Sequence, residues 1–306
     1  MTTQPPLRGD VAVVVPAAGL GTRLGPGAPK ALRTLAGVPI LRHAVAGLAA
    51  APSVAAIVVA APADDDRRVA AMLADLGLPS DAPGTGKSSG PAAGPPDRAD
   101  PAGAGGPGGA VHGPVAAPAA LAAPEQQSDA ARPRTVPVRT ADPAPVSGGD
   151  RRPFLLVVPG GATRQESVAA ALAAVPPGLD IVCVHDAARA LAPAALVESV
   201  ASAVRAGAAA VVPVLPVVDT VRAVGAGGAL AGVVDRAALR RVQTPQGFRR
   251  AVLAAAHARG GVSATDDAGL VEGLGVPVTA VAGAEEAFKI TTPYDLAVAE
   301  ALLAAR

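Results

Sequence analysis

Residues 11–25 read VAVVVPAAGLGTRLG, and residues 28–32 read APKAL. The apolar, β-branched run Val11–Val15 predicts a buried strand, and the small residues after it predict a loop whose backbone amides can approach a ligand closely. Amides at the end of a strand bind phosphate groups, and Arg23 and Lys30 add two positive charges nearby. The segment therefore predicts an α/β fold with a site for a nucleoside triphosphate.

Other phosphate-binding loops fit the sequence less well. A dinucleotide-binding fingerprint needs a glycine where Leu24 stands, and a Walker A loop at Gly86 and Lys87 needs a glycine where Asp81 stands. A strand-to-helix turn without a ligand is the remaining alternative. The fixed offsets of Arg23 and Lys30 from the glycines argue against it.

Apolar runs alternate with alanine-rich segments along the chain, which is typical of stacked βαβ units and predicts a doubly wound, mostly parallel Rossmann-like sheet. We expect strands at Val11–Val15, Ala55–Ala60, Phe154–Val158, Asp180–Val184, Ala208–Val214 and Val276–Val281. We expect helices near Ile40–Ala50, Asp64–Leu76, Arg164–Ala174, Pro193–Ala206, Arg249–Ala258, Asp266–Leu274 and Pro293–Ala304. Because the carboxyl ends of parallel strands share one edge of a sheet, loops 16–23, 160–164 and 185–189 should meet in one crevice.

Residues 79–152 differ in composition from the rest of the chain. They hold 14 of its 32 prolines, 12 of its 35 glycines and no aromatic residue. Such a segment cannot bury enough apolar surface to offset the entropy of ordering it. We predict a disordered insertion at 79–152, within one α/β domain formed by residues 1–78 and 153–306.

The segment 215–242 predicts a protruding β-arm. Two β-like runs, Asp219–Val224 and Leu230–Asp235, flank a glycine-rich stretch at 225–228, which is typical of a hairpin. A hairpin that leaves a doubly wound sheet has edges that another element must cover.

Composition excludes several classes of protein. The net charge is +1 and Lys and Arg form no stripe, so we expect no nucleic-acid partner and no membrane surface. The single cysteine, Cys183, excludes an intrachain disulfide. No apolar run reaches membrane-spanning length, and the run after Asp10 is too short for a signal peptide, so we predict a cytoplasmic protein.

Several motifs occur in a fixed order along the chain: Pro16–Leu32, Gly160–Val168, Val184–Arg189, Asp219–Thr220, Val234–Arg236, Gln243–Gln246, Thr265–Asp267 and Lys289–Thr291. In this order they resemble the 2-C-methyl-D-erythritol 4-phosphate cytidylyltransferases of the non-mevalonate isoprenoid pathway. The resemblance implies the fold of the nucleotide-diphospho-sugar transferases and transfer of CMP from CTP to 2-C-methyl-D-erythritol 4-phosphate. It also implies a Mg²⁺ cofactor and a homodimer in which the arm reaches the partner's active site.

Four basic residues are the candidates for catalysis. Attack of a phosphate monoester on the α-phosphorus of a triphosphate needs alignment and neutralisation of charge, but no covalent intermediate. Arg23 can bind phosphate oxygens as a fork, and Lys30 can act as a point charge near the α-phosphate. By resemblance, Arg236 and Lys289 hold the phosphate of the acceptor. An ion pair of Arg236 with Asp235 at the surface is the alternative.

The resemblance places the nucleotide against Pro16, Ala17, Ala18, Gly19, Gly21, Gly160, Gly161, Ser167, Asp186 and Ala187. The glycine backbone and the Ser167 hydroxyl are expected to read cytosine. Asp186 follows a buried strand, where an unpaired carboxylate is costly unless it meets a metal or ribose hydroxyls, so we assign it to the nucleotide and to Mg²⁺.

The candidates for contact with the acceptor are Arg189, Thr220, Thr244 and Thr265. Arg189 is also expected to orient Asp186, three residues before it. Threonines in turns often make local hydrogen bonds instead, and for Thr265 the alternative is capping of the helix that follows.

Three other functions stay open on the sequence alone. The acceptor could be ribitol 5-phosphate or another sugar phosphate. A nucleotide-binding regulatory protein without turnover is disfavoured by the retained basic residues. A nicotinamide-dependent oxidoreductase is disfavoured by the missing glycine at Leu24.

Overall fold

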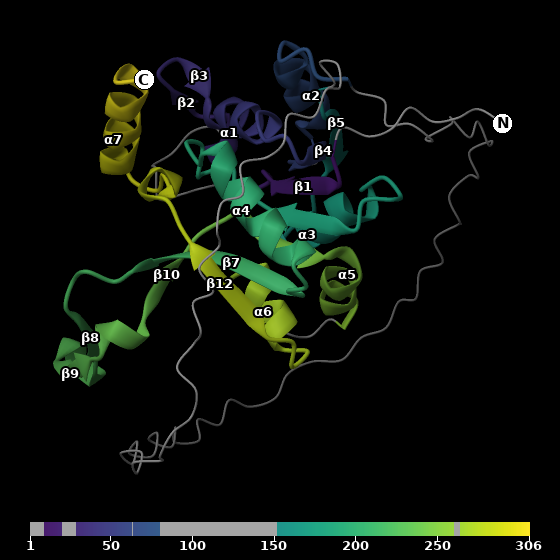
Figure 1. The fold of residues 1–306 in the computed structure, drawn as a ribbon. Helices are drawn as coiled ribbons and strands as arrows, with labels where there is room; N and C mark the ends of the chain where they lie inside the picture. The colour runs from purple at the N-terminus through teal and green to yellow at the C-terminus, as the bar shows by residue number, and fades with distance from the viewer. Residues whose placement is uncertain (1–8, 20–28, 63, 80–151, 260–263) are drawn as a thin grey trace, which may run out of the picture. The chain divides into compact units, whose positions relative to one another are not determined.

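A mostly parallel sheet of eight strands forms the centre of the fold (Figure 1). The strands are β1 (Val11–Pro16), β4 (Val54–Ala61), β5 (Phe154–Pro159), β6 (Ile181–Val184), β7 (Ala210–Pro216), β10 (Arg240–Val242), β11 (Gln246–Arg249) and β12 (Val278–Ala282). Their order is β10-β7-β11-β6-β1-β4-β5, and β12 pairs with β7. The pairs β1–β4, β1–β6, β4–β5 and β7–β12 are parallel, whereas β10 and β11 run antiparallel to their neighbours. The predicted α/β class with a mostly parallel sheet is confirmed.

The structure is a computed structural model that describes residues 9–19, 29–62, 64–79, 152–259 and 264–306. These residues belong to one unit, formed by residues 1–85 and 140–306. The insertion is predicted at 79–152, and its residues 80–151 lie outside the described residues, so it stays a prediction. Within the described ranges, no helix is long and apolar enough to cross a bilayer.

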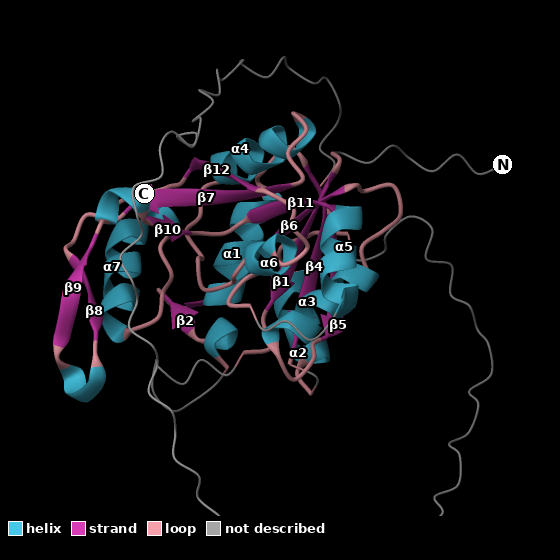
Figure 2. Cartoon of the chain, turned by 90° about the horizontal axis from the view of Figure 1, so that it is seen from below, coloured by secondary structure: helices cyan, strands magenta, loops and turns pink. Residues whose placement is uncertain are grey.

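Helices cover both faces of the sheet (Figure 2). One face packs against α1 (Ile40–Ala49), α2 (Asp66–Ala74) and α4 (Ala194–Arg205). The other packs against α3 (Arg164–Ala173), α5 (Arg250–Arg259) and α6 (Asp267–Glu272). Because side chains alternate between the faces of a strand, Val13 and Val15 enter the first core and Ala12 and Val14 the second. This double burial explains why the strand that precedes the glycine loop is apolar at every position.

A third, smaller core lies beside the sheet. It joins α7 (Pro293–Ala304) to the short hairpin of β2 (Thr34–Leu35) and β3 (Val38–Pro39) through Leu35, Ile290 and Ala299. The Glu300 carboxylate on α7 also accepts a hydrogen bond from the Ala36 amide in the turn of this hairpin, at 3.3 Å. The segment that carries residues 289–291 is therefore fixed on both sides, by the sheet and by α7.

The predicted β-arm is present and stands apart from the central sheet (Figures 1 and 2). Strands β8 (Val221–Val224) and β9 (Leu230–Val234) pair antiparallel in a sheet of their own. Gly227 and Gly228 adopt φ values of +72° and +82° in the turn, a left-handed conformation that glycine tolerates without strain. The arm leaves the main sheet at the end of β7 and returns to it through β10.

Every predicted strand and helix is confirmed, with ends that differ by three residues at most. Three elements of the sheets were not predicted: the β2–β3 hairpin, β10 and β11. Strand β11 lies between β6 and β7 and runs antiparallel to both. It joins β7 and β12 to the parallel strands β6, β1, β4 and β5.

Candidate active site

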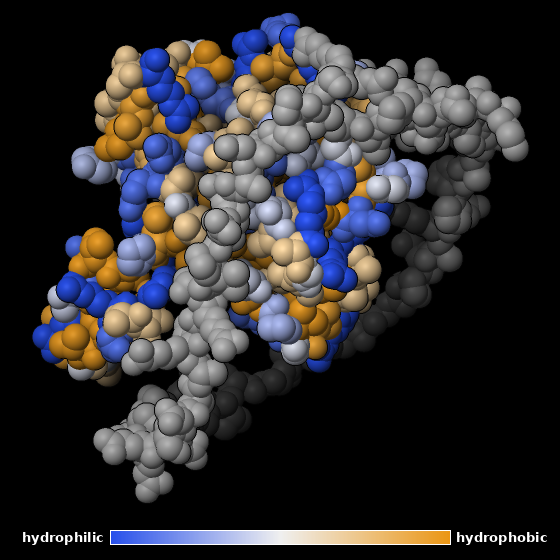
Figure 3. Space-filling view, viewed as in Figure 1, coloured by the Kyte–Doolittle hydropathy of each residue, from blue (hydrophilic) through white to orange (hydrophobic). Residues whose placement is uncertain are grey.

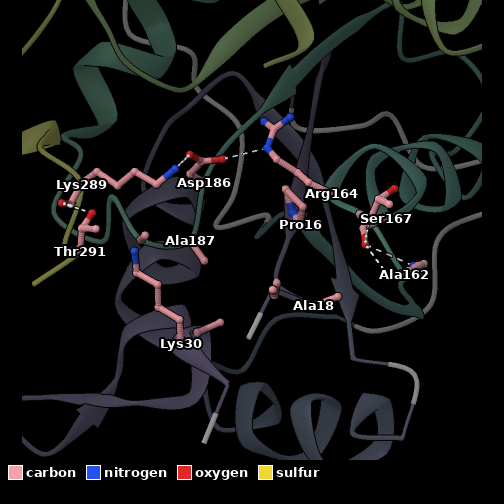
Figure 4. A pocket seen from close by; sticks show the side chains of 16 residues that line it. Pro16, Ala18, Lys30, Ala162, Arg164, Ser167, Asp186, Ala187, Lys289 and Thr291 are labelled. Atoms are coloured by element: carbon pink, nitrogen blue, oxygen red, sulfur yellow. Dashed lines mark hydrogen bonds and ion pairs between the residues drawn. The ribbon is translucent and has the colours of Figure 1, made fainter. Parts of the chain in front are cut away.

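The loops that follow β1, β5 and β6 meet in one pocket, as predicted (Figure 4). The start of α3, the short 3-10 helix at Lys30–Leu32 and the segment before α7 complete its wall. The residues that line it are Pro16, Ala17, Ala18, Gly19, Lys30, Ala31, Gly161, Ala162, Thr163, Arg164, Ser167, Asp186, Ala187, Ala188, Lys289 and Thr291. The pocket therefore combines small residues on one side with charged side chains on the other.

Gly160 and Gly161 allow the loop after β5 to approach its neighbours closely. A Cβ atom on Gly160 would lie 2.9 Å from the Cβ of Ala18, and a Cβ on Gly161 would lie 2.3 Å from the Cβ of Glu166. Both distances are too short for a side chain. Gly160 thus lets the loop after β5 pack against Ala18 in the loop after β1, and Gly161 lets it pack against Glu166 in the first turn of α3.

The Ser167 hydroxyl holds this glycine loop in place. Ser167 is buried, and its Oγ accepts a hydrogen bond from the Gly161 amide at 3.2 Å and donates one to the Thr163 carbonyl oxygen at 2.9 Å. Thr163 and Glu166 form a capping box at the start of α3. The backbone of Gly161 is therefore presented to the pocket in a fixed position.

Asp186 lies at the centre of the charged side. Its Oδ2 is 2.8 Å from the Nζ of Lys289, and its Oδ1 is 3.3 Å from the Nε of Arg164. Its amide donates to the Oγ1 of Thr244 at 3.0 Å. Burial alone would raise the pKa of Asp186, but the charges of Lys289, Arg164 and Arg189 lower it well below its usual value. Asp186 is therefore a carboxylate at neutral pH.

Arg164 joins Asp186 to a second carboxylate outside the pocket. Its Nη1 lies 2.8 Å from the Oδ2 of Asp267, which has no exposed surface. The Oδ1 of Asp267 lies 3.0 Å from the Nε2 of His257 on α5. A chain of polar contacts thus runs from His257 on α5 and Asp267 on α6 through Arg164 to Asp186 and Lys289.

Lys30 lines the pocket below Lys289 and Asp186 in the view of Figure 4. Its charge acts on Asp295, the third residue of α7. Burial would raise the pKa of Asp295, but backbone hydrogen bonds from Thr292 and Thr291 and the charge of Lys30 lower it. Lys30 and Lys289, which are far apart in the sequence, therefore line the same pocket.

A sequence profile described as IspD, 2-C-methyl-D-erythritol 4-phosphate cytidylyltransferase, matches residues 11–82 and 144–305. The chain belongs to this family. The cytidylyltransferase of Streptomyces avermitilis is 41% identical over 96% of this chain and 92% of its own length. That of Saccharopolyspora erythraea is 41% identical over 96% of this chain and 100% of its own length. The crystal structure of the cytidylyltransferase from Thermus thermophilus has a TM-score of 0.57 and 32% identity, and covers 94% of this chain and 97% of that chain. The predicted family, fold and class of enzyme are confirmed.

The pocket of this cytidylyltransferase contains most of the residues predicted for the nucleotide. Pro16, Ala17, Ala18, Gly19, Gly161, Ser167, Asp186 and Ala187 line it. Gly160 is not among the lining residues and lies against Ala18 instead. Of the predicted catalytic residues, Lys30 and Lys289 line the pocket. The predictions for Gly21 and Arg23 fall outside the described residues.

Arg189 and Thr244 support the pocket without lining it. The Arg189 guanidinium donates to the carbonyl oxygens of Ala287 at 2.7 Å and Val242 at 3.1 Å. The Arg189 amide donates to the Asp186 carbonyl oxygen at 2.9 Å, and the guanidinium acts on the Asp186 carboxylate through its charge. The expected role of Arg189 in orienting Asp186 stays a prediction. The Thr244 hydroxyl accepts from the Asp186 amide and lies 3.2 Å from the Nδ1 of His185.

Arg236 and Thr220 belong to the exposed β-arm and do not line the pocket of their own chain. The alternative of an Arg236–Asp235 ion pair is wrong. Arg236 donates to the Val218 carbonyl oxygen, and the Asp235 carboxylate accepts from the Ala237 amide. Both arm residues are exposed, and their contacts with the acceptor stay predictions.

Thr265 is exposed and does not cap α6. Asp266 is the N-cap of that helix, and its Oδ1 accepts from the Gly269 amide at 3.0 Å. The capping alternative for Thr265 is therefore wrong, and its contact with the acceptor stays a prediction.

Sequence reasoning missed Arg164, Asp267 and Thr291 as members of the site. All three lie inside motifs that the sequence singled out. Their partners are distant in sequence, however, and no local pattern indicates which carboxylate Arg164 contacts. The local signals were an arginine three residues after a glycine pair and a carboxylate at the start of a helix.

Proposed function

We propose that this pocket binds CTP and that the chain transfers CMP from CTP to 2-C-methyl-D-erythritol 4-phosphate, releasing pyrophosphate. The observation that carries the proposal is the meeting of Lys30 and Lys289 beside Asp186, opposite a tightly packed glycine loop. Membership of the family supports the identity of both substrates.

The reaction forms a bond from a phosphate oxygen of the acceptor to the α-phosphorus and breaks the bond from that phosphorus to the bridging oxygen of the β-phosphate. Negative charge develops on the transferred group and on the leaving pyrophosphate, and fixed ammonium groups stabilise it. Lys289 is held over the pocket by Asp186 and can exchange this carboxylate for phosphate oxygens. Lys30 supplies the second charge from a different element. A phosphate monoester dianion needs no general base, so the buried His185 has no step to perform.

The glycine loop after β5 favours a nucleotide with a pyrimidine base. Gly160 packs closely against Ala18, and the Ser167 hydroxyl fixes the Gly161 backbone by a hydrogen bond. Backbone amide and carbonyl groups there can pair with the edge of cytosine. A purine is larger and would collide with these close-packed loops.

Asp186 fits a Mg²⁺ site that is completed by the substrate. Mg²⁺ at nucleotide sites is held by one or two carboxylates together with phosphate oxygens. Asp186 is the only carboxylate among the described residues that line the pocket, and the described parts of the chain contain no group of three or more His, Cys, Asp and Glu side chains suited to a metal. The phosphates must therefore supply further ligands, and Lys289 must leave Oδ2. When bound, Mg²⁺ supplies neutralisation of phosphate charge.

The arm supports a homodimer. Val218, Val224, Leu230 and Val233 are each more than 60% exposed on it, and Figure 3 shows the apolar surface there. Apolar side chains gathered on one element are typical of a protein interface. In a dimer with twofold symmetry each arm would meet the partner's surface, and Arg236 would be brought to the partner's pocket.

We also propose a cytoplasmic location, because CTP is a cytoplasmic nucleotide and the chain has a single cysteine, Cys183, so that its fold uses no intrachain disulfide. Fractionation of cells that express the protein tests this. Recovery in the membrane or secreted fraction would contradict it.

An assay of pyrophosphate release tests the reaction. CTP, ATP, GTP and UTP are each supplied with 2-C-methyl-D-erythritol 4-phosphate, and CTP is then supplied with ribitol 5-phosphate. We expect turnover with CTP and the methylerythritol phosphate only, and only with Mg²⁺ present. Faster turnover with ribitol 5-phosphate or with a purine nucleotide would contradict the proposal.

A further inference from the structure

Asp267 is a buried carboxylate that the reaction itself does not use. It lies at the start of α6, outside the pocket lining, and has no exposed surface. Burying a charge in this way is costly unless it is paired. Its Oδ1 lies 3.0 Å from the Nε2 of His257, and its Oδ2 lies 2.8 Å from the Nη1 of Arg164 in an ion pair that lacks hydrogen-bond geometry. Both oxygens of Asp267 therefore face a basic side chain and not the pocket.

The partner that connects Asp267 to the reaction is Arg164. Its guanidinium divides its nitrogens between two carboxylates, Nη1 at 2.8 Å from Asp267 and Nε at 3.3 Å from Asp186. Arg164 lines the pocket, and its side chain is 33% exposed. A long side chain with this exposure is free to move unless one end is fixed. Asp267 is the group that fixes it.

Asp267 is itself held by two further elements. His257 reaches it from α5. From β11, the Gln246 amide group donates to Asp266 at 2.7 Å and accepts from the Ala268 amide at 3.1 Å. The residues before and after Asp267 are therefore both hydrogen-bonded to Gln246, and His257 contacts the Asp267 carboxylate itself. These contacts restrict the movement of Asp267.

We propose that Asp267 is a positioning residue that acts through Arg164 to keep the Asp186 carboxylate oriented during catalysis. This inference rests on the proposed role of Asp186. When Lys289 leaves Oδ2 for a phosphate oxygen, Arg164 stays on Oδ1 because Asp267 retains its other end. Without Asp267, the guanidinium can follow the phosphates of the nucleotide, and Asp186 loses its second support.

The test compares Asp267→Asn with Glu272→Gln. Glu272 is an exposed carboxylate at the end of the same helix, and its side chain makes no hydrogen bond or ion pair with the described residues. We expect Asp267→Asn to lower kcat by about 10- to 100-fold, as for other residues that orient a primary group, with the KM for CTP changed by less than about threefold. Glu272→Gln should keep kcat within about twofold. Equal kcat values for the two variants would overturn the inference.

Arg164→Lys keeps the charge but replaces the fork by one nitrogen. We expect it to match Asp267→Asn in kcat, and the double variant should be no slower than either single variant, because both break the same connection. Wild-type kcat in Arg164→Lys would overturn the inference, including in the case where Asp267→Asn does not fold.

Asp186→Asn separates this inference from the function on which it rests. Wild-type activity in Asp186→Asn would remove the role of Asp186 and the inference with it. Loss of activity in Asp186→Asn, combined with wild-type kcat in Asp267→Asn, would overturn the inference alone.

Discussion

His185 shows how one buried side chain makes the stability of this site depend on pH. It is 1% exposed, and its Nδ1 lies 3.2 Å from the Thr244 hydroxyl. Burial lowers its pKa from 6.5 to about 4, while Asp186 nearby opposes part of this shift. The folded protein therefore holds His185 neutral at a pH where the unfolded chain would already bind a proton.

The sign of the effect follows from linkage. Because the folded pKa is the lower one, the stability that depends on neutral His185 is fully present above pH 6.5 and is lost as the pH falls towards 4. We expect the free energy of unfolding to fall by up to about 1.4 kcal/mol per pH unit in this window. Urea unfolding across the window measures it. Asp186 and Asp10, whose pKa values are also lowered, act only below about pH 4.

His185→Asn can keep a polar contact with Thr244 and removes the titrating group. We expect a lower stability at neutral pH, because the side chain is smaller, and a much flatter dependence between pH 6.5 and 4. An equally steep dependence in the variant would show that another group titrates there.

At the scale of elements, the start of α3 and the glycine loop behave as one piece. Ser167→Ala removes the hydrogen bonds to the Gly161 amide and the Thr163 carbonyl oxygen. We expect a loss of about 1–3 kcal/mol in the free energy of unfolding and a raised KM for CTP, because Gly161 is no longer fixed. Ser202→Ala, on the exposed side of α4, is the matched control and should change neither quantity. An unchanged KM for CTP in Ser167→Ala would remove Ser167 from the nucleotide site.

The elements also show what the sequence could predict. The strands β1, β4 and β6 are continuous apolar runs because both faces of the sheet are covered, and this local signal was sufficient. Strand β11 has one large apolar side chain, Phe248, and owes its place to β6 and β7 on either side. Its Gly247 is required by a helix, since a Cβ there would lie 2.4 Å from the Cγ1 of Val200. Such a strand depends on tertiary contacts, which no local pattern records.

The site divides in the same way. Motifs predicted which loops form the pocket, because strand ends in a parallel sheet meet at one edge. They did not predict that Arg164 bridges Asp186 and Asp267, or that Arg189 holds Val242 and Ala287, because these pairings depend on side-chain geometry across the fold. The sequence therefore predicted the roles that follow from residue type, but it did not predict which side chains contact one another.

At the scale of the whole molecule, the arm separates two predicted catalytic residues. Lys289 lines the pocket, whereas Arg236 lies on the exposed arm of the same chain. In the proposed homodimer each active site takes Lys289 from one chain and Arg236 from its partner. Lys289→Ala and Arg236→Ala should therefore both be nearly inactive as pure proteins. In the first variant each pocket lacks a residue of its own chain, and in the second it lacks a residue of the partner chain.

Mixing these two variants tests the shared site. After joint unfolding and refolding, half of the dimers contain one chain of each kind, and in each of these one pocket has both residues. We expect activity to return to about a quarter of the wild-type rate. Mixing Lys289→Ala with Lys30→Ala is the matched control: Lys30 and Lys289 line the same pocket of one chain, so no pocket regains both and no activity should return. The two mixtures differ only in the second variant, which lacks either Arg236 on the arm or Lys30 in the pocket. Equal rates in the two mixtures would therefore contradict a site that is shared through the arm.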